Sequence, residues 1–179
     1  MKYLNSMIFA AFCLILMGCQ TEMESHNEEN DHGEMGEVKE LIDHGPDHHI
    51  LYKPEDIPWE DGPGSLEEGS QFYILEGDPG KAEVFNMRLK LPDGFHIAPH
   101  THPGVERVTV ISGEFVLGHG AEADMEEYYE LSPGSYTSMP PGMKHYAYAR
   151  GETVIQLVSV GPWEIDYINP EDDPRLRDN

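Results

Sequence analysis

From Gly94 to Gly113 the sequence reads GFHIAPHTHPGVERVTVISG, a run that combines histidines, turn residues and alternating apolar residues. Two of its histidines, His100 and His102, are separated by one residue. Side chains two positions apart lie on the same face of an extended chain, so both imidazoles are predicted to point to one place. Pro103-Gly104 then indicates a tight turn, which returns the chain toward these histidines.

Glu106 follows that turn at a position that predicts an inward-facing carboxylate. It alternates in phase with Val108 and Val110, which form the apolar face of a strand. An ionised carboxylate that faces a core is costly unless something pairs with it. Neutral imidazole and carboxylate are both ligands that borderline divalent metals accept. The run therefore predicts a metal centre that contains His100, His102 and Glu106.

A second cluster lies between Gly134 and Ala149, where the sequence reads GSYTSMPPGMKHYAYA. Its histidine, His145, follows a Pro-Pro-Gly turn and shares its strand face with Ala147 and Ala149. A histidine flanked by alanines faces a space rather than a packed wall, which fits a fourth metal ligand above a small-molecule cavity. Taken alone, such a histidine is more often a hydrogen-bonded structural residue.

The second half of the chain consists of short predicted strands separated by turn signals, which is typical of an all-β sandwich or barrel. No convincing helix and no repeat of fixed period is present there. We also expect a turn at Ser112-Gly113 that separates two strands. Besides the run described first, the expected strands span residues 71–75, 83–91, 114–118, 128–131, 135–139, 145–149 and 153–160.

The charge of the chain excludes one class of partner. Its 179 residues include 34 Asp and Glu against 11 Lys and Arg, which gives a formal net charge of -23. A negative charge of this size excludes nucleic acid as a partner and electrostatic attraction to anionic lipid. It fits a solvated surface instead. The length allows one domain of ordinary size with residues to spare.

The N-terminus has the pattern of a targeting segment that takes no part in the fold. A basic start is followed by an apolar run from Met7 to Met17, which is too short to span a bilayer. Leu16-Met17-Gly18-Cys19 resembles the lipobox of bacterial lipoproteins, which implies a signal peptide over residues 1–18 and acyl chains on Cys19. A plain secretory signal or an uncleaved anchor is the alternative.

Acylation at Cys19 implies a protein anchored by lipid in the bacterial cell envelope. By analogy with Gram-negative lipoproteins, Gln20 in place of aspartate indicates the outer membrane, with the periplasmic or external face left open. Residues 19–50 are acidic, rich in histidine and poor in apolar residues, so we expect a flexible tether. Its histidines fit either a metal-collecting tail or a hydrophilic spacer. Residues 51–179 then form the domain, with a barrel core at about residues 70–168.

Together the two clusters resemble the two motifs of the cupin superfamily, at the spacing of that family. The matching patterns are Gly94-x5-His100-x-His102-x3-Glu106-x6-Gly113 and Gly134-x5-Pro140-x-Gly142-x2-His145. The resemblance, to a single-domain, type-2-like bacterial cupin, implies an all-β fold with a single jelly-roll β-barrel. It also implies a metal held by His100, His102, Glu106 and His145. Ala149 departs from the pattern, because it stands where the second motif usually ends in an asparagine that is not a ligand.

The resemblance further implies a divalent transition metal and a small-molecule ligand in the barrel cavity. Iron, manganese, nickel, copper and zinc all fit three imidazoles and one carboxylate, so the metal stays open. The main interpretation is a metal-dependent enzyme of the oxygenase, lyase or isomerase class. His96, which strand alternation places in phase with His100, is the candidate acid or base, and Tyr148 and Tyr136 are weaker candidates.

Two other interpretations stay open. A non-catalytic module would hold a small molecule or a carbohydrate without turnover, and a purely structural metal would brace the barrel. Removing the metal distinguishes an enzyme from a binding module, because the turnover of a metal-dependent enzyme then stops. A homodimer formed through a barrel edge is compatible with the predicted fold, because an open sheet edge needs cover.

Overall fold

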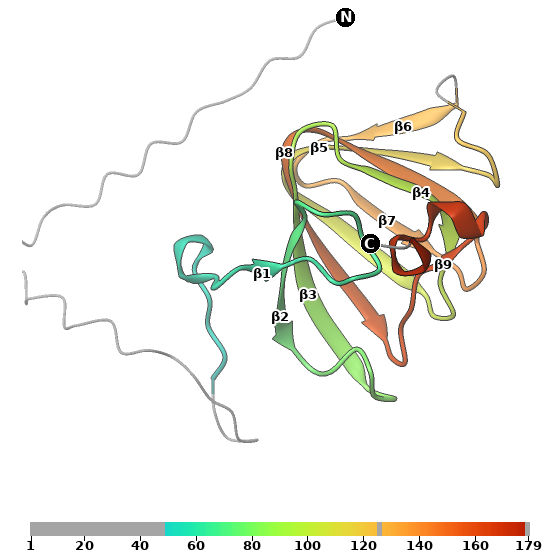
Figure 1. Cartoon of the computed structure of the whole chain (residues 1–179). Helices are drawn as coiled ribbons and strands as arrows, with labels where there is room; N and C mark the ends of the chain where they lie inside the picture. Colours follow the sequence, from blue (N-terminus) through green and yellow to red (C-terminus); the bar gives the residue numbers. More distant parts are fainter. Residues whose placement is uncertain (1–48, 125–126, 178–179) are drawn as a thin grey trace, which may run out of the picture. The chain divides into compact units, whose positions relative to one another are not determined.

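The fold is described by a computed structural model over residues 49–124 and 127–177 (Figure 1). The predicted signal peptide, Cys19 and nearly all of the predicted tether lie outside these described residues. Nine strands and three short 3-10 turns form the described part. Their bounds are η1 Pro54–Asp56, β1 Glu60–Asp61, β2 Gln71–Glu76, β3 Val84–Leu91, β4 His96–Thr101, β5 Glu106–His119, β6 Tyr128–Leu131, β7 Tyr136–Met139, β8 His145–Val160, β9 Asp166–Tyr167, η2 Pro170–Asp172 and η3 Pro174–Leu176.

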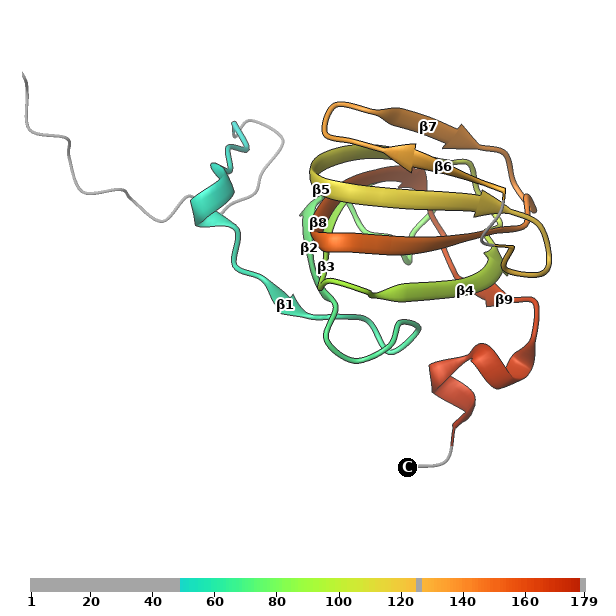
Figure 2. The same cartoon turned by 90° about the horizontal axis from the view of Figure 1, so that it is seen from above.

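The strands form one curled antiparallel sheet, seen from above in Figure 2. The long strand β8 is its centre and pairs with β3, β4 and β5. β5 also pairs with β6 and β7, β2 joins β1 to β3, and β9 pairs with β4. The predicted all-β fold with a curled, barrel-like sheet is thereby confirmed. Among the described residues, no helix has the length and hydropathy needed to cross a membrane.

The predicted turn at Ser112-Gly113 is wrong, because β5 runs through it without interruption. Gly113 adopts φ +76° while the pairing with β8 shifts register on either side of Ser112, so the residues form a bulge. A Cβ on Gly113 would lie 2.4 Å from the carbonyl oxygen of Glu152, so only glycine fits. The facing strand β8 also continues from His145 to Val160 rather than breaking after Ala149.

The core lies inside the curl and is built by strand alternation. On β3, every second side chain is at most 4% exposed, and β5 and β8 face the same interior with Val108, Val110, Ile155 and Leu157. The buried residues of β3 are Phe85, Met87, Leu89 and Leu91. Burial of a side chain of this size stabilises a fold by about 1.5–3 kcal/mol. This packing fixes β5 and β8, the two strands whose first residues belong to the site.

Candidate metal centre

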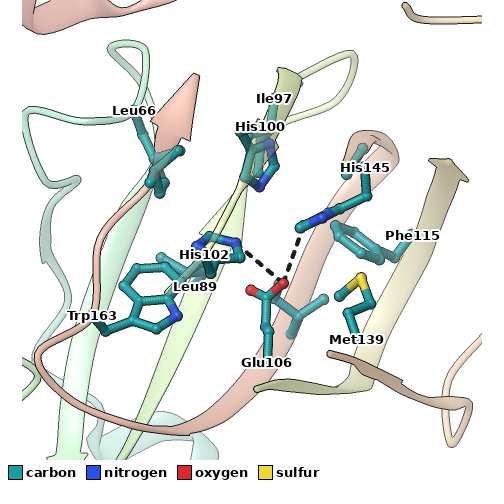
Figure 3. Close-up of a pocket in the computed structure, with 13 residues that line it drawn as sticks. Leu66, Leu89, Ile97, His100, His102, Glu106, Phe115, Met139, His145 and Trp163 are labelled. Carbon is teal, nitrogen blue, oxygen red and sulfur yellow. Dashed lines mark ion pairs between the residues drawn. The ribbon is translucent and has the colours of Figure 1, made fainter. Parts of the chain in front are cut away.

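Three histidines and one glutamate converge inside the curl (Figure 3). His100 on β4 lies directly opposite His145, the first residue of β8, and His102 follows β4. All three histidines are buried, and one ring nitrogen of each lies within 4.8 Å of the other two. Glu106, the first residue of β5, places Oε2 3.3 Å from His102 Nε2 and 3.2 Å from His145 Nε2. The four residues predicted to meet therefore do meet.

Backbone carbonyls orient all three imidazoles in the same way. Each Nδ1 lies within hydrogen-bond distance of one carbonyl oxygen: Ala98 for His100 (2.7 Å), Glu164 for His102 (2.6 Å) and Met143 for His145 (2.9 Å). A carbonyl only accepts, so Nδ1 carries the proton and donates. The opposite nitrogen, Nε2, is then the one left to face the cluster, as in metal-binding histidines whose other nitrogen is held by an outer partner.

The Nε2 atom of His102 gives the clearest test of whether a metal fits. It is buried without a hydrogen-bond partner, although Glu106 Oε2 lies 3.3 Å away. His102 Nε2 and Glu106 Oε2 are close enough for an electrostatic contact, but their relative direction does not satisfy a hydrogen bond. A buried polar atom without a partner costs about 1–3 kcal/mol. A cation held among these nitrogens and the carboxylate would relieve that cost, so the residues fit a metal.

Burial and mutual charge set the protonation of the cluster. Burial, together with repulsion from His145 and His102, lowers the pKa of His100 to about 3. Burial raises the pKa of Glu106, but attraction to His102 and His145 outweighs it and holds this pKa well below its usual range. For His102, burial lowers the pKa, and the carboxylate of Glu106 more than reverses this. Glu106 is therefore an ionised carboxylate and His100 a neutral imidazole, the states in which metals bind such ligands, whereas a protonated His102 has to release a proton when a metal binds.

A small apolar cavity of ≈ 20 Å³ adjoins the cluster. That volume accommodates about one water-sized group. Besides the four converging residues, its described lining is entirely hydrophobic. These residues are Leu66, Leu89, Ile97, Phe115, Met139, Ala147, Ile155, Trp163 and Ile165. Among the side chains that line it, only the three imidazoles and the carboxylate are titratable groups.

The segment after β8 supports the cluster, and the sequence analysis missed this. The Trp163 ring stacks on His102 with centroids 4.5 Å apart and planes 17° apart. The next residue, Glu164, supplies the carbonyl that accepts from His102, and Tyr167 in β9 pairs with His100. The available signal was limited to aromatic residues soon after the last long strand.

The expectation that His96 shares the strand face of His100 is wrong. The pairing of β4 with β8 shifts register between Ile97 and His100, so Ile97 lines the cavity and His96 faces the other side. His96 instead pairs with Tyr148, and their rings stack 4.3 Å apart at 9°. His96 lines a separate outer pocket, and Tyr148 lies on the same outer face of the sheet. Tyr136 is 61% exposed.

Comparisons with known proteins agree with this geometry. Residues 87–161 match the family model described as the cupin domain. No curated protein matches the chain.

Solved structures resemble the fold. The polyketide cyclase RemF from Streptomyces resistomycificus has a TM-score of 0.56 and 19% identity, covering 71% of this chain and 90% of that one. An acetylacetone dioxygenase from Acinetobacter johnsonii has a TM-score of 0.53 and 16% identity, covering 69% and 80%. KdgF from Halomonas sp. has a TM-score of 0.48 and 24% identity, covering 62% and 94%. The part of the chain that matches the cupin domain, residues 87–161, thus contains all four converging residues.

Proposed function

We propose that His100, His102, Glu106 and His145 together bind one divalent transition metal ion. One observation carries this proposal: three buried imidazoles present one nitrogen each within 4.8 Å of one another, beside a buried carboxylate. The donor set accepts iron, manganese, nickel, copper or zinc, and affinity alone does not choose among them. The residues are already oriented by three backbone carbonyls, so little order has to be gained when the ion binds.

We propose that the protein uses this metal as an enzyme acting on a small molecule at the apolar cavity. The metal would supply polarisation of a substrate oxygen or activation of dioxygen. The hydrophobic lining would exclude water from the surroundings of the metal. His96 and Tyr148 face away from this cavity, so a proton that must be moved would be taken up by Glu106 or by a cluster histidine.

This lining favours oxygenase chemistry over the lyase and isomerase classes. A reaction that needs a separate acid and base requires two free titratable groups at the substrate. Among the residues described at the cavity, the titratable groups are Glu106 and the three imidazoles, and all four are proposed metal ligands, so none of them is free. Oxidation by dioxygen needs fewer acidic or basic side chains at the substrate, because the metal supplies most of the chemistry.

Capture of a small molecule without turnover is the second candidate function. One observation favours it: the described cavity lining offers no acid or base apart from the proposed ligands.

We further propose that acyl chains on Cys19 and the tether of residues 19–50 hold the domain at the outer membrane. The lipobox-like sequence supports this anchor. A homodimer stays a prediction.

Dioxygen uptake separates the two functions. Full-length protein in mild detergent, loaded in turn with each of the five metals, is mixed with a panel of small ketones and carboxylic acids. We expect substrate-dependent uptake with wild type and His96→Ala, and none with Glu106→Gln or His102→Ala, whose folding is checked by circular dichroism. Saturable binding without consumption of dioxygen or substrate would contradict the enzyme and support the binding module.

A further inference from the structure

The cavity beside the four converging residues is smaller than any substrate. Its volume of ≈ 20 Å³ accommodates about one water-sized group, so a larger molecule enters only if a lining side chain moves. Most of the hydrophobic lining lies on paired strands, where backbone hydrogen bonds hold each residue in place. The lining residues outside the strands are Leu66, Trp163 and Ile165. A route into the cavity is therefore sought at these three.

Trp163 and Ile165 are tied to the rest of the fold by their backbone. The N–H of Trp163 donates to the carbonyl of Pro79 (2.9 Å), and the carbonyl of Ile165 accepts from Arg175 (2.8 Å). The carbonyl of Glu164, between them, lies 2.6 Å from Nδ1 of His102. Moving this segment would therefore break several hydrogen bonds and disturb a proposed metal ligand.

Leu66 lies instead in the loop of residues 62–70, which connects β1 to β2 and is called the cap loop below. The ends of the cap loop are close together, since the N–H of Gly62 donates to the carbonyl of Ser70 (2.8 Å) beside the pairing of β1 with β2. Within residues 62–70, Leu66 is the only buried hydrophobic side chain, and Figure 3 shows it among the side chains around the cluster. A compact loop with close ends moves as one unit without opening the sheet.

Two polar contacts join the cap loop to other parts of the described chain, and both come from the C-terminal segment. The hydroxyl of Tyr167 donates to the carbonyl of Ser65 (2.7 Å), and Arg177 Nη1 lies 2.6 Å from Glu67 Oε1. Figure 1 shows the loop between β1 and β2 beside this segment. The side chains of the ion pair are about half exposed, so the pair contributes little, and a single hydrogen bond contributes modestly. The cap loop is therefore held less firmly than the strands.

We propose that the cap loop is a lid, which moves outward, withdraws Leu66 from the cavity and thereby admits molecules from solvent to the four converging residues. The contacts made by Tyr167 and Arg177 hold the lid closed. The inference goes beyond the proposed function, because it concerns access to the cluster and holds whether or not a metal binds there. Leu89 lines the same cavity from β3, but its backbone is paired with both β2 and β8, so it is the matched residue that does not withdraw.

The test measures how fast a reagent larger than the cavity reaches the cluster. Full-length protein in mild detergent, with a chelator that keeps the imidazoles free of metal, is treated with diethyl pyrocarbonate, which acylates histidine. Tandem mass spectrometry of peptides gives a separate rate for each histidine. We expect His100, His102 and His145 to react much more slowly than the exposed His119, because their reaction waits for the lid to open.

Variants of the two contacts should open the lid without changing its surface toward the cavity. Tyr167→Phe removes the hydroxyl and keeps the ring, and we expect the cluster histidines to react about fivefold faster, the effect of losing one hydrogen bond. Arg177→Gln removes the exposed ion pair and should accelerate them about twofold. Leu66→Ala, which shortens the side chain that fills the entrance, should accelerate them more than either. The rate of His119 should stay unchanged in all three.

Leu89→Ala is the control, because it removes the same atoms from the same cavity on a paired strand. We expect it to accelerate the cluster histidines less than Leu66→Ala, although urea unfolding should show a loss of stability in both. Equal acceleration in the two variants would overturn the inference, since access would then follow general loosening of the core. Cluster histidines that react as fast as His119 in wild type would overturn it too. If Leu66→Ala does not fold, Tyr167→Phe and Arg177→Gln decide, and unchanged rates in both contradict the lid.

Discussion

His96 and His100 lie on the same short strand, yet the structure places them in opposite environments. His100 faces two imidazoles and a carboxylate inside the curled sheet. His96 stacks on Tyr148 outside it and lines a pocket that contains Asp172. The irregular pairing between Ile97 and His100 reverses the strand phase and separates them. The face of the strand on which a histidine lies, and not the residue type, therefore decides which histidine belongs to the cluster.

The direction of the pKa shift does not distinguish these two histidines. Burial lowers the pKa of both, and for His100 repulsion from the neighbouring histidines lowers it further, to about 3. For His96, attraction to Asp172 and Glu67 acts in the opposite direction. The cluster is therefore recognised by its geometry, and variants at the two positions should behave differently.

The largest expected difference is in metal affinity. His102→Ala removes a proposed ligand, and we expect zinc affinity to fall by more than about 100-fold, since the loss of an outer partner alone costs 10–100-fold. His96→Ala is expected to leave the affinity within about twofold. Competition with a chromophoric chelator measures both. Equal losses in the two variants would erase the distinction between the inner and outer histidines.

The next effect is the pH dependence of stability in the metal-free protein. Between pH 6.5 and 3 the unfolded chain binds a proton that folded His100 does not, so the free energy of unfolding falls as the pH falls, by about 1.4 kcal/mol per pH unit. Glu106, whose pKa is lowered, adds to this loss below pH 4.5. His102 has a raised pKa, so its contribution is present below pH 6.5 and is lost as the pH rises through its folded pKa.

We therefore expect stability in chelator to be greatest near pH 6.5, as measured by urea unfolding. His100→Asn should flatten the acid side of the profile, while His96→Asn should change it less. A profile that rises steadily from pH 6.5 to pH 4 would show that burial of His100 does not govern the acid side.

The smallest expected effect concerns the outer stack. Tyr148→Ala removes the ring that packs on His96, and such a pair adds about 0.5–1.5 kcal/mol beyond area burial. We expect a modest loss of stability with unchanged zinc affinity. Tyr148→Phe, which keeps the ring, is the control and should retain most of the stability. A large loss of zinc affinity in Tyr148→Ala would connect the outer stack to the metal centre.

The sequence was sufficient to predict the cluster, because local rules indicate His100, His102 and Glu106 and the resemblance to the second cupin motif adds His145. Strand alternation orients Glu106, and turns return the chain beside His102 and His145. The same alternation failed for His96, because a register shift within β4 leaves no clear trace in residue type. Ser112-Gly113 has the composition of a turn but forms a bulge, since the partner strand β8 continues beside it.

The support from the last segment could not be predicted because it is a tertiary contact. Glu164 lies 62 residues after His102 in the sequence. Its backbone carbonyl accepts a hydrogen bond from His102 Nδ1. Nothing in the spacing of Trp163 indicates that its ring stacks on that histidine. Local patterns therefore predicted the ligands, while the residues that orient them depend on how the chain folds back.

The central claim is that the four inner residues hold one metal ion. Elemental analysis of the full-length protein, purified in mild detergent and exposed to each candidate metal in turn, tests it most directly. The account predicts about one equivalent of a single divalent transition metal per chain under at least one of these conditions. Substoichiometric metal under every condition, in a protein shown to be folded, would contradict it.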